Sequence, residues 1–497
     1  MQGEKKFEAK IYYGINLDEL VPSDHLLRKL DKLISFEFVR DKTKRYYSHT
    51  GKPSVDPTVL VKMLIIGYLY DIRSERRLVE DVSLNLAYRW YVGYDIDERI
   101  PDHSIFTKAR KRFGKKLFIQ IFEEILSKCI QAQIVLGKEV LMDSTLVRAD
   151  ASMNSIIDVN LSPEQYWRKL EESEVPTGPR GRKPKEGGPT HVGSHFKGNK
   201  IDPGKMGKRR RIANAKYLKK RSTTDPDATL HFRAGMGSML SYKAHIAADP
   251  GGIITAVAVS PSATHDSAGA PELLRQHEKL LGTPTWATAD SKYGSQECLG
   301  YLQAKGIKTA IKPASTNNRP GCYPKDIFRY HAKNDHYICP AGRILKRRRK
   351  NNNTNQVFYR ADKEDCLNCD LRKRCIKPHR QGPRTVTRFD NDYYEKAKIW
   401  YVSFIGKKLY KLRKTVMEGL FGEAKTYHGL SMAKLRGIDN VEIQLLLTAT
   451  VLNIKRLFKK LDAETLRNAT QKLQDQFQYL VFSIFHRYLA RLLVCWV

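Results

Sequence analysis

The sequence predicts a mixed α/β core that follows an all-helical N-terminal domain, and three observations lead to this fold class. In residues 1–130, apolar side chains recur at helical spacing. From Lys138 onward, short β-branched runs alternate with helical stretches. Two long segments, one strongly basic and one containing cysteines, interrupt this alternation. A chain of 497 residues has room for roughly two to four domains.

The predicted N-terminal domain covers residues 1–130. Helices are expected over 21–34, 56–72, 73–94 and 100–130, and the third stretch fits one amphipathic helix or two. Ser23 or Asp24 suits the N-cap of the first helix. A short turn before the last helix would let its basic residues, among them Lys108 and Arg110, enter a DNA groove. The alternative is a helical bundle whose basic faces contact only water.

The predicted core covers residues 138–160 and 222–314. A strand over 138–150 is followed by a hairpin over 240–260 around a Pro-Gly-Gly turn, and then by a helix over 267–281. A strand over 283–290, a helix over 295–306 and a strand over 307–313 complete the alternation. This order is that of a ribonuclease H-like (RNase H-like) sheet, in which the first and fourth strands lie side by side.

Three acidic residues occupy informative positions in this arrangement. Asp143 ends the apolar run VLMD, Asp290 ends TPTWATAD, and Glu418 opens the helical pattern MEGLFGEAK. Adjacent first and fourth strands would bring Asp143 near Asp290, and a late helix in residues 406–460 can deliver Glu418. Three carboxylates can hold two divalent metal ions, which drive in-line attack on a phosphodiester. Glu423 is the alternative third carboxylate.

The bulk charge indicates a polyanionic partner. The formal net charge is +35 and the isoelectric point is near 9.8, which favours nucleic acid over the alternative of an anionic membrane surface. No apolar run reaches the roughly 18 residues that span a bilayer. The N-terminus lacks a signal-peptide core. Eight cysteines in this length are few for a disulfide scaffold, so a reducing cytoplasm is expected.

The first interruption, residues 161–221, is predicted to be a basic flexible insertion. Residues 178–221 hold fifteen Lys or Arg against two acidic residues. Within it, GPRGRKPK is similar to an AT-hook, whose arginines, here Arg180 and Arg182, enter the minor groove of A·T-rich DNA. A tether that binds DNA without sequence preference is the alternative.

The second interruption, residues 315–405, contains a candidate zinc site. Cys366 and Cys369 have the spacing of a pair that chelates zinc, and Cys375 with Cys339 could complete four thiolate ligands. The alternatives are free cysteines, or a histidine such as His331 or His379 as the fourth ligand.

Together these segments resemble the DDE transposases of bacterial insertion sequences. The landmarks include LMDSTLVRADAS, SYKAHIAAD, ADSKYGS, CLNC and VMEGLFGEAK, and they extend from about residue 12 to residue 460. The resemblance implies a helical transposase domain followed by an RNase H-like catalytic domain. It also implies that Asp143, Asp290 and Glu418 form the metal-binding triad for two Mg²⁺ ions, with Mn²⁺ as a substitute.

A helix signature of the same family implies further DNA contacts. The pattern is Tyr, two residues, Arg, three residues, Glu, six residues, Lys, and Glu418 with Lys425 keeps the last spacing. Lys414 stands where the arginine is expected, and Arg413 lies one residue earlier. Glu418 and Lys425 are seven residues apart and therefore share one helix face, so that Lys425 could reach a phosphate beside the metals.

The resemblance implies an enzyme that binds the terminal inverted repeats of its element, cleaves the ends and joins them to target DNA. Two ends must be held together, so a homodimer on double-stranded DNA is expected, with the apolar helices of 406–460 and the tail of 461–497 as candidate contacts. The expected location is the bacterial cytoplasm, at the nucleoid. The alternatives are a nuclease of the same fold without strand transfer, and a DNA-binding protein derived from a transposase.

Overall fold

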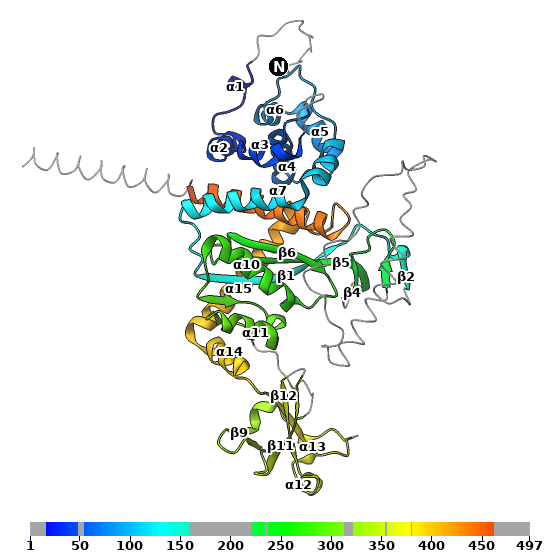
Figure 1. The fold of residues 1–497 in the computed structure, drawn as a ribbon, viewed down its shortest axis with the longest axis vertical. Coiled ribbons are helices and arrows are strands. Elements are labelled where there is room, and N and C mark those ends of the chain that lie inside the picture. The colour runs from blue at the N-terminus through cyan, green and yellow to red at the C-terminus, as the bar shows by residue number, and fades with distance from the viewer. Residues whose placement is uncertain are drawn as a thin grey trace, which may run out of the picture.

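A computed structural model describes residues 16–47, 54–158, 220–233, 237–312, 322–352, 355–378 and 380–461. Its parts follow one another along the longest axis in Figure 1. A group of N-terminal helices lies at one end, a large sheet covered by helices lies in the middle, and a small sheet lies at the other end. None of the helices in these ranges is both long and apolar enough to cross a membrane.

The predicted helical character of the N-terminal region is confirmed in its described part. Asn85 divides the stretch 73–94 into two helices, since it ends one and its side chain caps the next by accepting from Tyr88 N. His25, rather than Ser23 or Asp24, caps the helix over 26–33. The elements are α1 Leu17–Leu20, α2 Leu26–Leu33, α3 Phe38–Thr43, η1 Lys44–Tyr46, α4 Pro57–Leu69, α5 Glu75–Leu84, α6 Leu86–Val92 and α7 Ser104–Gln131.

Helix α7 connects this region to the large sheet. Gly114, with φ +60° and ψ −169°, interrupts its helical geometry and kinks it. Beyond the kink, Lys115 Nζ lies 3.1 Å from Asp439 Oδ1 and 3.2 Å from Glu442 Oε2. These partners belong to a C-terminal helix over residues 438–461. The basic α7 therefore packs beside the last described helix, as Figure 1 shows.

The large sheet has the order β2-β3-β4-β5-β1-β7-β8, and β6 also pairs with β5. β5 and β6 form the predicted hairpin, and β7 lies parallel beside β1, so the predicted contact of the first and fourth core strands is confirmed. The strands are β1 Glu139–Arg148, β2 Ile156–Asp158, β3 Lys220–Ser222, β4 Thr229–Arg233, β5 Gly237–Ala248, β6 Ile254–Pro261, β7 Trp286–Thr288 and β8 Lys308–Thr309. The short strands β2, β3 and β4 were not predicted from the sequence.

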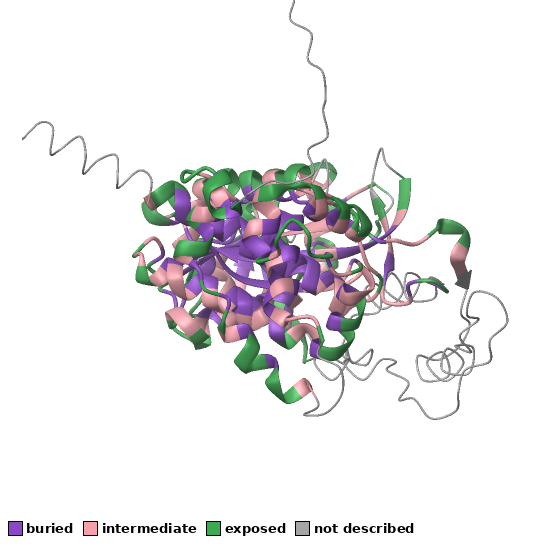
Figure 2. Ribbon diagram, turned by 90° about the horizontal axis from the view of Figure 1, so that it is seen from above, coloured by how far each residue is buried: buried purple, intermediate pink, exposed green. Residues whose placement is uncertain are grey.

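Helices cover both faces of this sheet. Val140 and Met142 of β1 pack into one core with α10 and α11, whereas Leu141 and Val147 face a second core that includes α15 and the 438–461 helix. Figure 2 shows this interior as a continuous buried region. The elements between and around the strands are η2 Met153–Ser155, η4 Asp266–Gly269, α10 Ala270–Leu281, η5 Ser291–Tyr293, α11 Gln296–Ala304, α14 Tyr393–Val402 and α15 Phe404–Tyr427.

The small sheet lies within the cysteine-containing segment and has its own core. Its strands follow the antiparallel order β13-β12-β11-β10-β9, and Tyr337, Leu345, Val357, Tyr359 and Val386 pack beneath it. Helix α14, at the end of the predicted 315–405 segment, packs instead on α11 and β8 of the large core. The elements are η6 Lys325–Ile327, β9 Arg329–His331, β10 His336–Ile338, β11 Ile344–Asn351, β12 Gln356–Ala361, α12 Lys363–Leu367, α13 Arg372–Cys375 and β13 Thr385–Phe389.

Candidate active site

Two of the predicted metal ligands, Asp143 and Asp290, meet on neighbouring parallel strands. The register of β1 with β7 pairs Glu139 with Trp286 and Leu141 with Thr288. Continued by two residues, this register sets Asp290 opposite Asp143, at the roughly 4.8 Å spacing of adjacent strands. Both residues are half-buried. Asp290 lies two residues beyond β7, at the end of the stretch predicted as a strand over 283–290. Asp143 lies inside β1, which runs to Arg148 much as the strand predicted over 138–150 does.

The surroundings of Asp143 favour a nearby cation. Burial raises the pKa of Asp143, the charge of Arg413 opposes this, and the charge of Asp290 raises the pKa further. The Asp290 carboxylate also accepts a hydrogen bond from Lys292 N at 3.0 Å, which fixes its orientation at the start of η5. Two half-buried carboxylates side by side repel each other unless a positive charge lies between them. Oxygen ligands of this kind suit hard divalent cations such as Mg²⁺.

Arg413 supplies that positive charge in the structure. The side chain comes from α15 and is 8% exposed, and its guanidinium forms an ion pair with the Asp143 carboxylate. It also lies over the ring of Tyr410, 5.3 Å from the centroid. The sequence-based role of Arg413 as a DNA contact does not fit this conformation, because the side chain is buried against β1 rather than presented on the surface.

Glu418, the third predicted ligand, lies on the exposed side of α15. The buried side of this helix carries Leu409, Arg413, Met417, Leu420 and Ala424. A helix turns about 100° per residue, so Glu418 is rotated about 140° from Arg413. Within the part of the chain that the structure describes, no group of three or more His, Cys, Asp or Glu side chains is arranged to hold a metal ion. The structure thus brings together two of the three predicted carboxylates, Asp143 and Asp290, and leaves Glu418 apart from them.

The rival third carboxylate, Glu423, has a different environment. Its oxygens lie 2.6 Å from Lys455 Nζ and 3.1 Å from Arg456 Nη2, both on the 438–461 helix. The His428 imidazole, whose Nε2 lies 3.9 Å from Glu423 Oε1, and these two cations lower the pKa of Glu423 to about 2. A carboxylate held by this network connects α15 to the C-terminal helix, which leaves Glu418 as the carboxylate of α15 with an exposed side chain.

This difference predicts unequal effects on stability for two substitutions on one helix. Glu423→Gln is expected to lower the free energy of unfolding by about 2 kcal/mol, because two charge-assisted hydrogen bonds are lost. Glu418→Gln should change it by less than about 0.5 kcal/mol, because the side chain is exposed. Chemical denaturation of both variants measures the difference. Equal stabilities would show that Glu423 does not connect the two helices.

Asp266 is a further acidic residue near this site, and it follows His265, the N-cap of η4, in the segment ATHDS. It is buried, with Lys243 Nζ at 2.5 Å and Lys292 Nζ at 3.4 Å. Burial alone would raise the pKa of Asp266, but its hydrogen bond to Lys243 and the charges of both lysines hold the pKa below its usual range. Lys292 itself is exposed and immediately follows the Asp290–Ser291 step. Asp266 therefore holds Lys292 beside the Asp143–Asp290 pair.

The other predicted DNA-binding residues have mixed outcomes. Arg110 is buried, and its Nη1 lies 2.5 Å from Glu75 Oε1, so its predicted role in a DNA groove does not fit this structure. Lys108 and Lys414 are exposed, and Lys425 is half-buried on α15. Arg180 and Arg182, which are predicted to enter the minor groove, lie outside the described residues.

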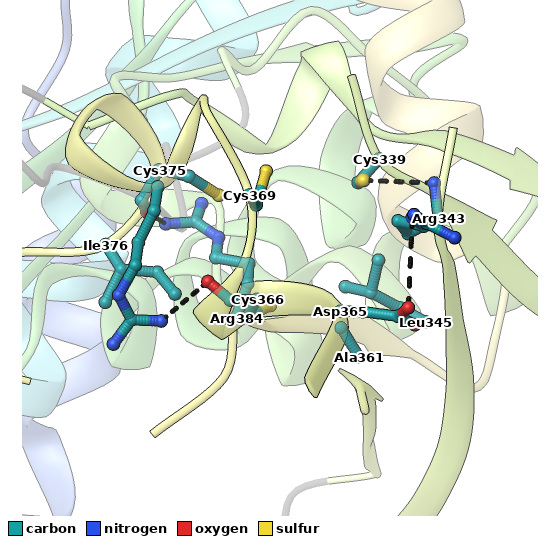
Figure 3. Close-up of a pocket in the computed structure, with 11 residues that line it drawn as sticks. Cys339, Arg343, Leu345, Ala361, Asp365, Cys366, Cys369, Cys375, Ile376 and Arg384 are labelled. Atoms are coloured by element: carbon teal, nitrogen blue, oxygen red, sulfur yellow. Dashed lines mark hydrogen bonds and ion pairs between the residues drawn. The ribbon is translucent and has the colours of Figure 1, made fainter. Parts of the chain in front are cut away.

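The four predicted zinc ligands line one small cavity in the small sheet domain. Its volume is about 20 Å³, which is room for a single ion or water. Figure 3 shows Cys369 and Cys375 on one side of the cavity and Cys339 on the other. Cys339 Sγ accepts a hydrogen bond from Arg343 N at 3.3 Å. The sulfurs surround the cavity without forming a coordination cluster in the described structure.

Burial and the neighbouring thiols affect Cys375 in particular. Burial raises the pKa of the Cys375 thiol to about 11, the Arg384 charge opposes this, and the other three cysteines raise it further. Of the two alternative fourth ligands, His331 stacks on His336 at 5.1 Å and does not line the cavity. His379 lies outside the described residues.

Comparisons with known proteins agree with this division of the chain. A family described as a transposase domain (DUF772) matches residues 15–112, and a family described as a transposase DDE domain matches residues 338–458. The first match is the helical region, and the second includes the cysteine cavity and α15 with Glu418. Asp143 and Asp290 lie between the two matches.

Among solved structures, the chain is similar to the cryo-EM structure of a piggyBac transposase synaptic complex with hairpin DNA. The alignment covers 86% of this chain and 78% of that chain, at 9% sequence identity and a TM-score of 0.30. No curated protein matches the chain.

Proposed function

We propose that the chain is a DDE transposase that cleaves DNA at the ends of its own element and joins those ends to target DNA, because transposase families match residues 15–112 and 338–458. The observation that carries this proposal is the meeting of Asp143 and Asp290 on parallel strands. The order β6-β5-β1-β7-β8, in which β5 alone runs antiparallel to the other four strands, supports an RNase H-like core. The net charge of +35 supports a DNA substrate.

Asp143 and Asp290 would hold the divalent cations, since their paired carboxylates fit hard cations and already attract a guanidinium. When bound, two such cations activate a water or a 3′-hydroxyl and stabilise the leaving oxygen. Arg413 would give up its contact with Asp143 to a bound cation. Glu418 would complete the ligand set through an adjustment of α15, and Lys292 would face the substrate from the other side.

Strand transfer by the wild-type protein tests the proposal. The substrate is a duplex with the element's own end, mixed with supercoiled plasmid in the presence or absence of Mg²⁺. Joined products that need Mg²⁺ would support a transposase. Cleavage without joining would favour an RNase H-like nuclease, and binding with no cleavage would favour a DNA-binding protein derived from a transposase.

The proposal extends to the assembly and its location. Terminal inverted repeats would be bound by the helical region and the basic insertion, and a homodimer would hold two ends together. Such an enzyme would work in the bacterial cytoplasm, where it reaches the nucleoid.

We also propose that Cys339, Cys366, Cys369 and Cys375 bind a structural zinc ion, because all four line one cavity of ion size. Purified wild-type protein is then expected to contain about one zinc per chain by elemental analysis, and Cys366→Ser should lose most of it. Cys322→Ser is the matched control, since Cys322 lies in the same domain but outside the cavity. If His331→Ala also loses zinc, His331 rather than one of the cysteines is the fourth ligand. Equal zinc content in all variants would refute the zinc site.

A further inference from the structure

Basic side chains cross one face of the small sheet from strand to strand, and the hydrophobic cluster of its described residues lies on the other face. The register pairs His331 with His336, His336 with Lys346, Lys346 with Arg360 and Arg360 with Thr385. Directly paired residues point to the same face of a sheet. The alternating positions, such as Leu345 and Tyr359, fill the core on the opposite face.

A second row on this face adds an aromatic side chain. A bulge at Arg348 shifts the register, so that Arg349 pairs with Phe358, which in turn pairs with Thr387. The Arg349 guanidinium lies over the half-buried Phe358 ring, 4.4 Å from its centroid. We call the surface formed by Lys346, Arg348, Arg349, Phe358 and Arg360 the outer face.

The outer face contains a groove of about 430 Å³. Four basic side chains and a single carboxylate, that of Asp362, line it together with Phe358 and Thr385. Asp362 forms ion pairs with Arg348, which lines the groove, and with Lys346, which does not, and thereby restrains one cation in the groove and one outside its lining. The groove keeps an excess of positive charge despite this carboxylate, and Figure 1 shows its domain projecting from the large core.

This arrangement carries an energetic cost that a simple solvated face would not need. Lys346 and Arg360 are directly opposite each other on adjacent strands, and like charges in such pairs destabilise a sheet, a cost that the Asp362 carboxylate beside Lys346 offsets in part. A polyanion that bridges the two side chains would reverse that cost. Stacking on Phe358 also restrains Arg349, so less conformational entropy is lost when the guanidinium meets a phosphate.

We propose that the outer face binds the phosphate backbone of double-stranded DNA and positions it without reading its sequence. The inference rests on the proposed function for the source of the DNA, but its evidence is the charge and register of the small sheet alone. Arg349 and Arg360 contact successive phosphates along the groove and Lys346 contacts one beside it, as backbone-positioning contacts do in other proteins.

The test measures binding of the full-length protein to a duplex as a function of salt, without added Mg²⁺. Each lost phosphate contact reduces the slope of log Kobs against log salt by about 0.9. Arg349→Gln/Arg360→Gln is therefore expected to reduce the slope by about 1.8 and to do so equally on duplexes of unrelated sequence. Lys333→Gln/Lys373→Gln removes the same charge from exposed sites of the same domain outside the groove and should change the slope by less than half as much.

Each result decides the proposal separately from the proposed enzyme activity. Equal slopes for both double variants would overturn the inference even if Mg²⁺-dependent cleavage is observed. A loss confined to one duplex sequence would contradict backbone positioning, and unchanged duplex binding with lost single-strand binding would contradict the duplex assignment. A selective reduction in slope would support it even in a protein that never cleaves. Matching thermal unfolding of the variants shows that both proteins are folded.

Discussion

Asp143→Asn and Asp290→Asn are each expected to reduce Mg²⁺-dependent cleavage of the element's end by about 10³-fold or more. Each substitution removes one anionic ligand from a pair that faces the same position. Metal-ion stabilisation of a phosphodiester transition state is worth several kcal/mol, and about 1.4 kcal/mol corresponds to a tenfold change in rate. The amide is nearly isosteric, so packing against the sheet is retained while the negative charge is lost.

Single-turnover cleavage and DNA binding, measured on the same preparations, test this expectation. Binding should persist in both variants, because the bulk of the positive charge is unaffected. Glu297→Gln is the matched control, since this exposed carboxylate lies in the first turn of α11 and makes the same change of charge. Wild-type rates in either aspartate variant would remove that residue from the metal site.

Arg413→Gln is expected to destabilise the protein in metal-free buffer by about 3 kcal/mol, which is the usual cost of removing one partner of a buried ion pair. Asp143 would then face Asp290 with no guanidinium between the carboxylates and the solvent. Mg²⁺ should restore stability in the variant, and its effect on the unfolding temperature should exceed that in wild type. The reason is that the cation no longer competes with Arg413 for the same carboxylate.

Thermal unfolding with and without Mg²⁺ separates this role from ordinary packing. Arg413→Lys keeps the charge and should behave more like wild type than Arg413→Gln does. Identical Mg²⁺ shifts in wild type and Arg413→Gln would mean that the guanidinium does not occupy the position of the metal. A loss of stability that Mg²⁺ leaves unchanged would assign Arg413 a packing role only.

Local sequence patterns predicted the central part of the fold well. The hairpin β5–β6 follows from two β-branched runs around a Pro-Gly-Gly turn, and the strand β1 follows from its apolar run. The adjacency of β1 and β7 followed from the order of elements, and it brought Asp143 to Asp290. These features depend on the local residue pattern and on the order of the elements along the chain, and both can be read from a sequence.

Features that depend on tertiary contacts were not predictable in the same way. The short strands β2 and β3 pair over only three residues each, on the two sides of the basic insertion, so no periodicity marks them. Arg110 and Arg413 are basic residues in amphipathic helices, and only the packed structure reveals their acidic partners. The exposed position of Glu418 likewise depends on how α15 is rotated against the sheet.

The attachment of the small sheet has a consequence for the evolution of this chain. The chain leaves the large core after β8 and returns at α14, and α14 packs directly on β8. Both connections therefore lie at one place, while the small domain folds around a hydrophobic cluster of its own. Such a module can be gained, lost or exchanged as a unit without breaking the sheet that holds Asp143 and Asp290. Related chains can accordingly differ in this small domain and still keep the same aspartate pair.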